Sequence, residues 1–186
     1  MILDIPNSAI INRIIPKDRF NFKNPTSIER IRWIAKLSTI TINVLSNNVS
    51  EVEVISVDLP DFDINVIKEI KDKIPQEILF IVNEDIAVME YNKQIFCKKI
   101  DSKLYITGIS TDDIRDNFVR QILGIGDTSV PLTNQINKYN KWKQLNKNIT
   151  DINNKIKKST QLNKKQELAR KRYVLEQSKI KIEGEL

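Results

Sequence analysis

The sequence predicts an α+β domain over residues 1–130 and a long basic helix or coiled coil over residues 131–186. Short β-branched and apolar runs separated by turn residues occupy the middle of the chain, which is typical of a mostly antiparallel sheet of five or six strands. Apolar residues at helical spacing flank these runs and predict helices beside the sheet. Charge then divides the chain, because residues 1–130 hold 16 Lys or Arg against 19 Asp or Glu, whereas residues 131–186 hold 14 against 5.

The start of the chain is expected to form two helices and then a strand. Isoleucines at helical spacing between two prolines predict a helix over residues 7–15. Residues 26–29 have the pattern of a capping box and precede apolar residues at helical spacing, which predicts a second helix over residues 28–37. Residues 39–44 alternate β-branched apolar and polar side chains, so a half-buried strand is expected there.

The middle of the body is expected to contain most of the sheet. A strand is predicted over residues 51–59, and its apolar phase switches near Val54, which indicates either a bulge or burial of both faces. Apolar residues at helical spacing predict a helix over residues 61–73, ended by Pro75. Short strands separated by tight turns follow, and then a helix closed by glycine; we expect them at residues 78–82, 86–91, 94–100, 104–107 and 114–123.

The tail carries an apolar seam in its first half. Its members are spaced 3, 4, 3 and 4 residues apart, as in the a and d positions of a coiled coil. The seam turns polar from Ser159 onward, so one continuous helix and a helical hairpin that breaks near residues 158–160 both remain open. We expect self-association through the seam, against the alternative that it packs on the protein's own body. The expected oligomerisation residues are Trp142, Leu145, Ile149, Ile152 and Ile156.

The tail also concentrates basic residues that suit a polyanion. On one continuous helix, positions 155, 158, 165 and 172 would form a stripe able to follow phosphates along about 25 Å of duplex. The alternative is a solvated helical face enriched in lysine by AT-rich codons, since Lys outnumbers Arg 22 to 8. The expected nucleic-acid-binding residues are Lys155, Lys158, Lys164, Lys165, Arg170, Lys171 and Arg172.

Composition excludes several kinds of chemistry. The chain has no His and a single Cys, Cys97, so it cannot build a Ser-His-Asp or Cys-His catalytic group or a structural zinc site of four His or Cys ligands. Residues 124–127, Gly-Ile-Gly-Asp, lack the remainder of a nucleotide-binding loop. We therefore expect no cofactor, no metal and no catalytic residue. Cys97 is expected to be a structural thiol on a half-buried strand.

A metal-dependent nuclease is the one enzyme class that the composition permits, because it needs only carboxylates and a lysine. Asp61 followed by Asp101-Ser102-Lys103 formally spells such a pattern, but the second segment is expected to be a turn. Glu51, Glu53 and Asp58 lie on a predicted strand without a lysine at the required spacing. Nuclease activity is therefore the weaker alternative.

Targeting patterns are not found. The first residues show no basic segment followed by a sustained apolar run, and no stretch is long and apolar enough to span a membrane. The single cysteine fits a reducing compartment. A cytoplasmic protein without membrane contact is expected.

The order of several short motifs resembles an uncharacterised family of small bacterial proteins, a domain of unknown function, over about residues 1–182. Its genes are often seen near helicases and DNA methyltransferases of restriction or anti-phage loci, which implies a nucleic-acid defence context. No catalytic residue is assigned in the family, and this chain is shorter and richer in lysine than its typical members. The motifs that carry the resemblance are Ile15-Pro16-Lys17, Ile31-x-Trp33-x-x-Lys36-Leu37, the acidic strand 51–59, Ile74-Pro75-x-x-Ile78-Leu79-Phe80-Ile81, and Gln161-x-Asn163-Lys164-Lys165-x-Glu167.

Together these observations favour a non-enzymatic accessory subunit of a bacterial defence or DNA-modification complex. The body would dock a larger protein, such as a helicase or methyltransferase as the resemblance implies, and the basic helix would contact nucleic acid. The alternatives are a protein-interaction or oligomerisation module that does not bind nucleic acid, and a metal-dependent nuclease.

Overall fold

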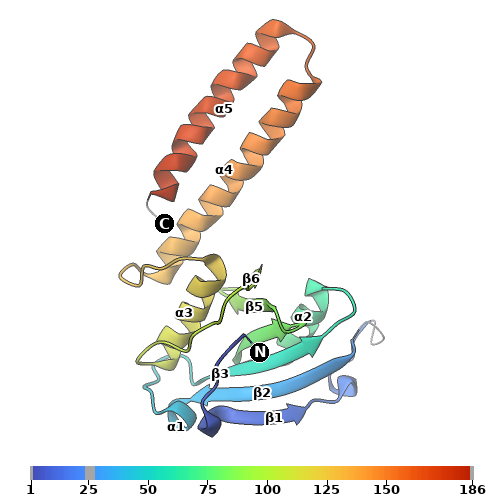
Figure 1. Ribbon diagram of the computed structural model, residues 1–186, viewed down its shortest axis with the longest axis vertical. Helices are drawn as coiled ribbons and strands as arrows, with labels where there is room; N and C mark the ends of the chain where they lie inside the picture. The colour runs from blue at the N-terminus through green and yellow to red at the C-terminus, as the bar shows by residue number, and fades with distance from the viewer. Residues whose placement is uncertain (1, 24–27, 185–186) are drawn as a thin grey trace. The chain divides into compact units, whose positions relative to one another are not determined.

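The computed structural model describes residues 2–23 and 28–184. They form two compact units, one ending at Gly126 and the other beginning at Asp127, before the boundary expected after residue 130. The first unit is α+β, as the sequence predicts, and the second is a pair of long helices (Figure 1). The capping box expected at residues 26–29 lies partly outside the described residues.

The body contains one six-stranded sheet whose strands lie in sequence order. All neighbouring strands are antiparallel except β3 and β4, which are parallel because the helix α2 (Ile64–Lys71) crosses between them. The expectation of a mostly antiparallel sheet is therefore confirmed. The strands are β1 (Ile10–Ile14), β2 (Arg30–Ser38), β3 (Glu51–Asp58), β4 (Glu77–Val82), β5 (Ile86–Tyr91) and β6 (Gln94–Lys99).

Each face of the sheet has its own core. Helix α2, capped by the Asp63 side chain, packs its apolar side on Ile55, Val57 and Phe80. The alternate residues of these strands, such as Val54, are also buried but lie outside that cluster, so they point to the opposite face. Helix α3 (Thr111–Leu123) contacts β3, β5 and β6. Burial of both faces thus explains the apolar phase of β3.

The prediction of a helix over residues 7–15 is wrong. A 3₁₀ turn, η1 (Asn7–Ala9), leads into β1, an exposed edge strand paired with β2. Asn12 adopts a positive φ of 49° where the pairing shifts register between Ile10 and Arg13. The isoleucine spacing reflects this irregular strand rather than a helix face, and pairing with β2 overrides the local pattern.

The prediction of a helix over residues 28–37 is wrong for a related reason. These residues form β2, and its pairing with β3 shifts between Trp33 and Ala35, so Ile34 is a bulge. Trp33 pairs with Ile55, whereas Lys36 pairs with Glu53. A bulge exchanges the two faces of a strand, so the buried residues after it fall at spacings that resemble a helix. The same bulge places Trp33 and Lys36 on one face.

Two further strands were expected where none forms. Residues 39–44 contain the short helix α1 (Thr39–Ile42), because Ser38 and Thr41 form a reciprocal capping box and Asn43 ends the helix in the left-handed region. In residues 104–107 only Leu104 pairs, in an isolated bridge with Leu3. The other expected strands and the helix α3, which ends at Gly124 with a φ of 77°, are confirmed.

The second unit is a helical hairpin. Helix α4 (Leu132–Lys158) ends where the apolar seam turns polar, and helix α5 (Leu162–Glu183) returns beside it. Of the two possibilities left open by the sequence, the hairpin is confirmed. Three residues, Ser159 to Gln161, make the turn between the helices, and Figure 1 shows α4 and α5 side by side.

Candidate functional site

The apolar seam of α4 packs against α5 of the same chain. All five seam residues are half-buried, and Leu168 and Leu175 of α5 are half-buried with them. Near the open end of the hairpin, the Trp142 indole Nε1 donates to the Glu183 carboxylate over 2.9 Å. Nearer the turn, the Arg172 guanidinium donates to the Asn153 side-chain oxygen over 3.3 Å. The helices therefore pack antiparallel in a fixed register within one chain.

This packing changes the meaning of the expected oligomerisation residues Trp142, Leu145, Ile149, Ile152 and Ile156. The seam is covered by the chain's own second helix, which leaves its residues half-buried rather than exposed. Self-association through the same residues stays a prediction. It would require a second copy to pack on the side of the hairpin that α5 leaves open.

The basic residues do not form the stripe that the sequence predicts. The stripe over positions 155 to 172 needs one continuous helix, and the chain reverses after Lys158. Lys155 and Lys158 instead lie in the last turn of α4, and Lys164 and Lys165 in the first turn of α5. Lys157, which lies among them, joins the same cluster. We define the hairpin tip as residues 155–165.

The tip is exposed and unusually free of acids. All five lysines of the tip are exposed, and the sequence has no Asp or Glu from residue 152 to residue 166. No ion pair of a tip lysine is found among the described residues. The tip therefore presents five positive charges around a single turn.

The three remaining expected contacts differ from one another. Arg170 is exposed, like the tip lysines. Lys171 lies 2.5 Å from the Glu167 carboxylate, and this hydrogen bond lowers the pKa of Glu167. Arg172 is half-buried on the seam, where it lies 3.3 Å from Glu176 and contacts Asn153, so it holds the hairpin together. It is not one of the solvent-facing positions that the sequence indicated.

A second cluster of polar and charged side chains lies on the α2 face of the sheet and was not predicted. The Trp33 indole Nε1 donates to the Glu53 carboxylate over 2.5 Å, and the Lys36 ammonium lies 2.5 Å from Glu51. Glu51 and Glu53 share a face because they are two residues apart on β3. Strand pairing and the bulge at Ile34 bring the β2 residues to the same place.

The electrostatics of this cluster are strongly perturbed. Glu53 is only 6% exposed, and its burial raises its pKa to about 7. The hydrogen bond from Trp33 works against that rise, while the nearby Glu51 carboxylate adds to it. The pKa of Lys36 is also raised, chiefly by its hydrogen bond to Glu51. A carboxyl poised near neutrality in a cleft is typical of functional sites.

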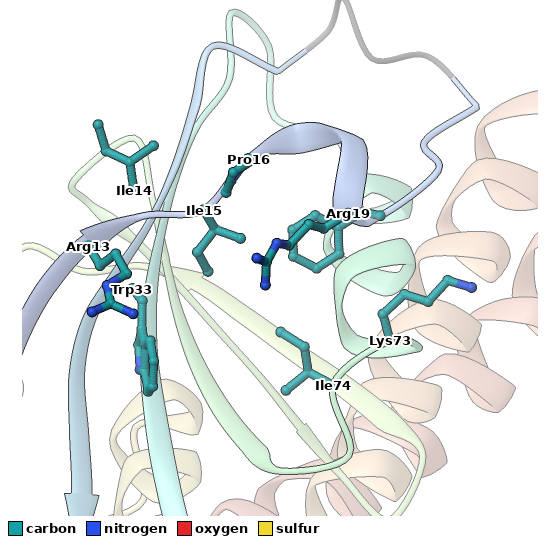
Figure 2. A pocket seen from close by; sticks show the side chains of 9 residues that line it. Arg13, Ile14, Ile15, Pro16, Arg19, Trp33, Lys73 and Ile74 are labelled. Atoms are coloured by element: carbon teal, nitrogen blue, oxygen red, sulfur yellow. The ribbon is translucent and has the colours of Figure 1, made fainter.

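Two adjoining cavities open onto this cluster. The first, of about 560 Å³, lies between β1, the turn η2 (Lys17–Arg19) and the end of α2, and is shown in Figure 2. The second, of about 300 Å³, contains Lys36, Glu51 and Glu53. Ile15, Trp33 and Ile74 line both, so the two cavities adjoin, and we refer to them together as the cleft.

The sequence carries part of the signal for this cleft. Glu51 and Glu53 lie on one strand, and that strand has no lysine at the spacing that a nuclease pattern requires. Lys36 instead comes from the neighbouring strand, at a position that depends on the register of β2 and on its bulge. Pairing register of that kind is a tertiary property.

Of the residues considered for the nuclease alternative, Glu51 and Glu53 gather with Lys36, whereas Asp58 and Lys103 lie in separate ion pairs. Asp58 pairs with Arg30 over 2.7 Å, and Lys103 pairs with Asp4 over 2.8 Å. Within residues 2–23 and 28–184, no group of three or more His, Cys, Asp or Glu could hold a metal ion. Cys97 lies within β6 as expected, but it is exposed.

No family model, curated protein or solved structure matches this chain. The resemblance to the bacterial domain of unknown function therefore stays a prediction. Among the described helices, none has both the length and the apolar character needed to cross a bilayer.

Proposed function

We propose that this protein is a non-enzymatic nucleic-acid-binding accessory subunit whose hairpin tip contacts the phosphate backbone. The observation that carries the proposal is the five exposed lysines at residues 155–165 with no acid from residue 152 to residue 166. Clustered lysines attract phosphates through counterion release and carry little sequence information. The tip therefore suits general contact with a duplex or a structured RNA.

The position of two of these lysines favours phosphate binding over the alternative that the tip lysines only contact solvent. Lys155, Lys157 and Lys158 occupy the last turn of α4, where positive charge stabilises the helix dipole. Lys164 and Lys165 occupy the first turn of α5, where positive charge opposes the dipole by roughly 0.3–1 kcal/mol each. That turn has no acidic residue. A sequence selected for helix stability alone would place acids there, so the lysines indicate an anionic ligand.

The experiment is fluorescence anisotropy with labelled duplex DNA and RNA over a range of salt concentrations. Five phosphate contacts on a duplex give a slope of about −4.5 for log K against log salt. Replacing Lys158, Lys164 and Lys165 with Glu should weaken binding at least tenfold at low salt.

A matched control has the same charge change on exposed lysines distant from the turn, in Lys141, Lys143 and Lys147 of α4. The affinity of this variant for the labelled nucleic acid should fall less than threefold. Equal losses in both variants would contradict a tip-centred interface. Absence of any affinity at low salt would leave the protein-interaction alternative.

The second part of the proposal is that the body docks a larger protein, such as a helicase or methyltransferase. The family resemblance supports it, and so does an exposed apolar surface. Leu45 and Ile109 are each more than half exposed and lie side by side, since the Leu45 amide donates to the Ile109 carbonyl over 2.9 Å. Ile40 is 92% exposed on the nearby α1, and exposed apolar groups of this kind often mark protein contacts.

The docking part is tested by affinity capture from the native host after nuclease treatment. The wild type should retain a helicase or methyltransferase that a Leu45→Asp, Ile109→Asp variant loses. The tip variant is the matched control and should retain the partner. Retention by the Leu45 and Ile109 variant would contradict docking through this surface.

A protein-interaction module remains the second candidate because α5 has exposed apolar residues away from the seam. Tyr173, Val174 and Ile180 are 61%, 63% and 59% exposed. Tyr173 and Ile180 are seven residues apart and so lie on the same side of α5. Light scattering over a concentration range would detect self-association through this side or through the open edge of the seam.

A further inference from the structure

The cleft on the α2 face joins two different chemical environments. Ile15, Trp33 and Ile74 form an apolar surface common to both cavities. In Figure 2, Ile15 and Ile74 point into the first cavity from opposite sides, with Trp33 beside it. The parts of β1, η2 and the segment after α2 that form the wall of the first cavity all lie within the described residues. The cleft is therefore a built hollow of the size that holds a small ligand.

Charge in the first cavity favours an anion. Arg13, Arg19 and Lys73 line it, and none of the described residues that line it is a carboxylate. Figure 2 shows the Arg19 guanidinium directed into the hollow and the Lys73 ammonium directed away from it. Neither Arg13 nor Arg19 makes an ion pair with any described carboxylate, unlike Arg30, which pairs with Asp58. Exposed guanidinium groups of this kind bind phosphate through paired N–H donors.

Trp33 supplies a flat apolar surface between the two cavities. Its indole N–H is fixed by the hydrogen bond to Glu53, so the orientation of the ring is set by the β2–β3 pairing. Aromatic rings held in this way stack on nucleobases. Beyond the ring, Glu51 can accept hydrogen bonds from a polar edge of the ligand, and Glu53 can accept them or, when protonated, donate one.

We propose that this cleft binds a nucleoside phosphate, with the phosphate on Arg13 and Arg19 and the base stacked on Trp33. The polar edge of the base then lies toward Glu53 in the second cavity. A divalent cation fits the cleft less well, because Lys36 already neutralises Glu51 and further positive groups line the adjoining cavity. The ligand is either a free nucleotide or the phosphorylated end of a nucleic-acid strand, which share this chemistry. The inference goes beyond the proposed function, since it concerns the body rather than the hairpin tip.

The test uses the full chain and isothermal titration calorimetry. The probes are the four nucleoside 5′-monophosphates, the corresponding nucleosides, inorganic phosphate, and dinucleotides with and without a 5′-phosphate. At least one monophosphate or 5′-phosphorylated dinucleotide should bind at least tenfold more tightly than its nucleoside and than inorganic phosphate. Tighter binding of the monophosphate identifies a free nucleotide, and tighter binding of the phosphorylated dinucleotide identifies a strand end.

Variants locate the site. Arg13→Gln with Arg19→Gln should weaken binding at least tenfold, and Trp33→Leu should weaken it while Trp33→Phe, which keeps a ring, should restore most of it. Lys98→Gln with Lys93→Gln is the matched control, because both lysines are exposed on or beside β6, and it should change binding less than twofold. In a Trp142→Phe background Trp33 is the remaining tryptophan, so its fluorescence should change on binding.

Two results would overturn the proposal. One is a nucleotide affinity no greater than that of inorganic phosphate, and the other is an equal loss in the arginine variant and the lysine control. The outcome is separable from that of the proposed function. The arginine variant should retain duplex binding at the tip, and the tip variant should retain nucleotide binding in the cleft.

Discussion

The buried carboxyl of Glu53 makes a quantitative prediction about stability and pH. Its pKa rises from the ordinary 4.5 to about 7 in the folded protein. Between these two values the folded state binds a proton that the unfolded state has released, so the free energy of unfolding falls as the pH rises. At 1.36 kcal/mol per pKa unit, the loss from pH 4.5 to pH 7 is about 3 kcal/mol. The loss is complete about one pH unit above the folded-state pKa of about 7.

The perturbation that tests this is Glu53→Gln, which keeps the shape of a protonated carboxyl and cannot ionise. The variant and the wild type should have similar stability near pH 4.5. At pH 8 the variant should be more stable by up to about 3 kcal/mol, because it avoids burying a charge. The amide oxygen can still accept the hydrogen bond from Trp33.

The chain is well suited to this measurement because it has no histidine. Few other groups titrate between pH 5 and pH 8, so the slope of stability against pH reports mainly on Glu53. Glu77 contributes in the same direction, since burial also raises its pKa. Glu51→Gln tests the contribution of the neighbouring carboxylate, because Glu51 adds to the rise in the pKa of Glu53 and its removal should weaken the pH dependence.

The assay is urea denaturation followed by circular dichroism at half-unit pH intervals from 4.5 to 8. Wild-type stability should decline across this range, and the decline should be largely removed in Glu53→Gln. Parallel curves for the two proteins would refute the reasoning, since they would show that Glu53 ionises in the folded state as it does in water. Carboxyl carbon NMR of the wild type would give the same pKa directly.

Three further variants test other parts of the structure. Gly108→Ala should cost roughly 2–4 kcal/mol by urea denaturation, because φ is 142° there and the added Cβ would lie 2.6 Å from a side-chain carbon of α3. Asp112→Ala should cost about 1–2 kcal/mol at pH 7, since its carboxylate accepts from backbone amides of residues 47–49. Burial opposes these donors, yet the pKa of Asp112 is lowered, so the cost should shrink as the pH falls below 3.8. Replacing Ile149 and Ile152 with Asp should reduce helical ellipticity at 222 nm and destabilise the hairpin by roughly 1–3 kcal/mol, while the body unfolds as before.

The elements that sequence patterns predicted well are those whose geometry is set locally. β5 and β6 are joined by Asn92 and Lys93, which both adopt positive φ as a tight hairpin turn requires. Helix α3 begins at a capping box formed by Ser110 and ends at Gly124. In such segments the turn or cap residues fix the boundaries, so the apolar spacing between them has one interpretation.

The elements that were predicted wrongly depend on contacts distant in the sequence. The bulge at Ile34 in β2 makes buried side chains recur at three-residue intervals, which a helix also does. Residues 39–44 have strand-forming side chains, but the cap formed by Ser38 and Thr41 turns them into a short helix. Pairing with neighbouring strands decides the first case, and a local hydrogen bond overrides propensity in the second.

The candidate sites also differ in whether they depend on local sequence or on contacts distant in the sequence. Sequence composition identified the basic tail, because charge is additive and needs no fold. The grouping of the lysines at a tip rather than along a stripe followed from the break at residues 159–161, which the sequence left open. The cleft was not predicted, since Trp33 and Glu53 meet only through the register between β2 and β3.

Lysine enrichment by AT-rich codons provides an alternative explanation for basic surfaces in this chain, and it applies unequally to the two sites. It could add lysines to the tip, although it does not explain why Asp and Glu are missing from residues 152–166. It cannot explain the cleft, because Arg13 and Arg19 are two of only eight arginines, in a body with three more acids than bases. The guanidinium groups of Arg13 and Arg19, which pair with no described carboxylate, lie at one cavity. The unit around them has more acids than bases, so its composition does not account for them. That contrast with the composition of the unit, more than positive charge itself, supports the proposal of an anionic ligand in the cleft.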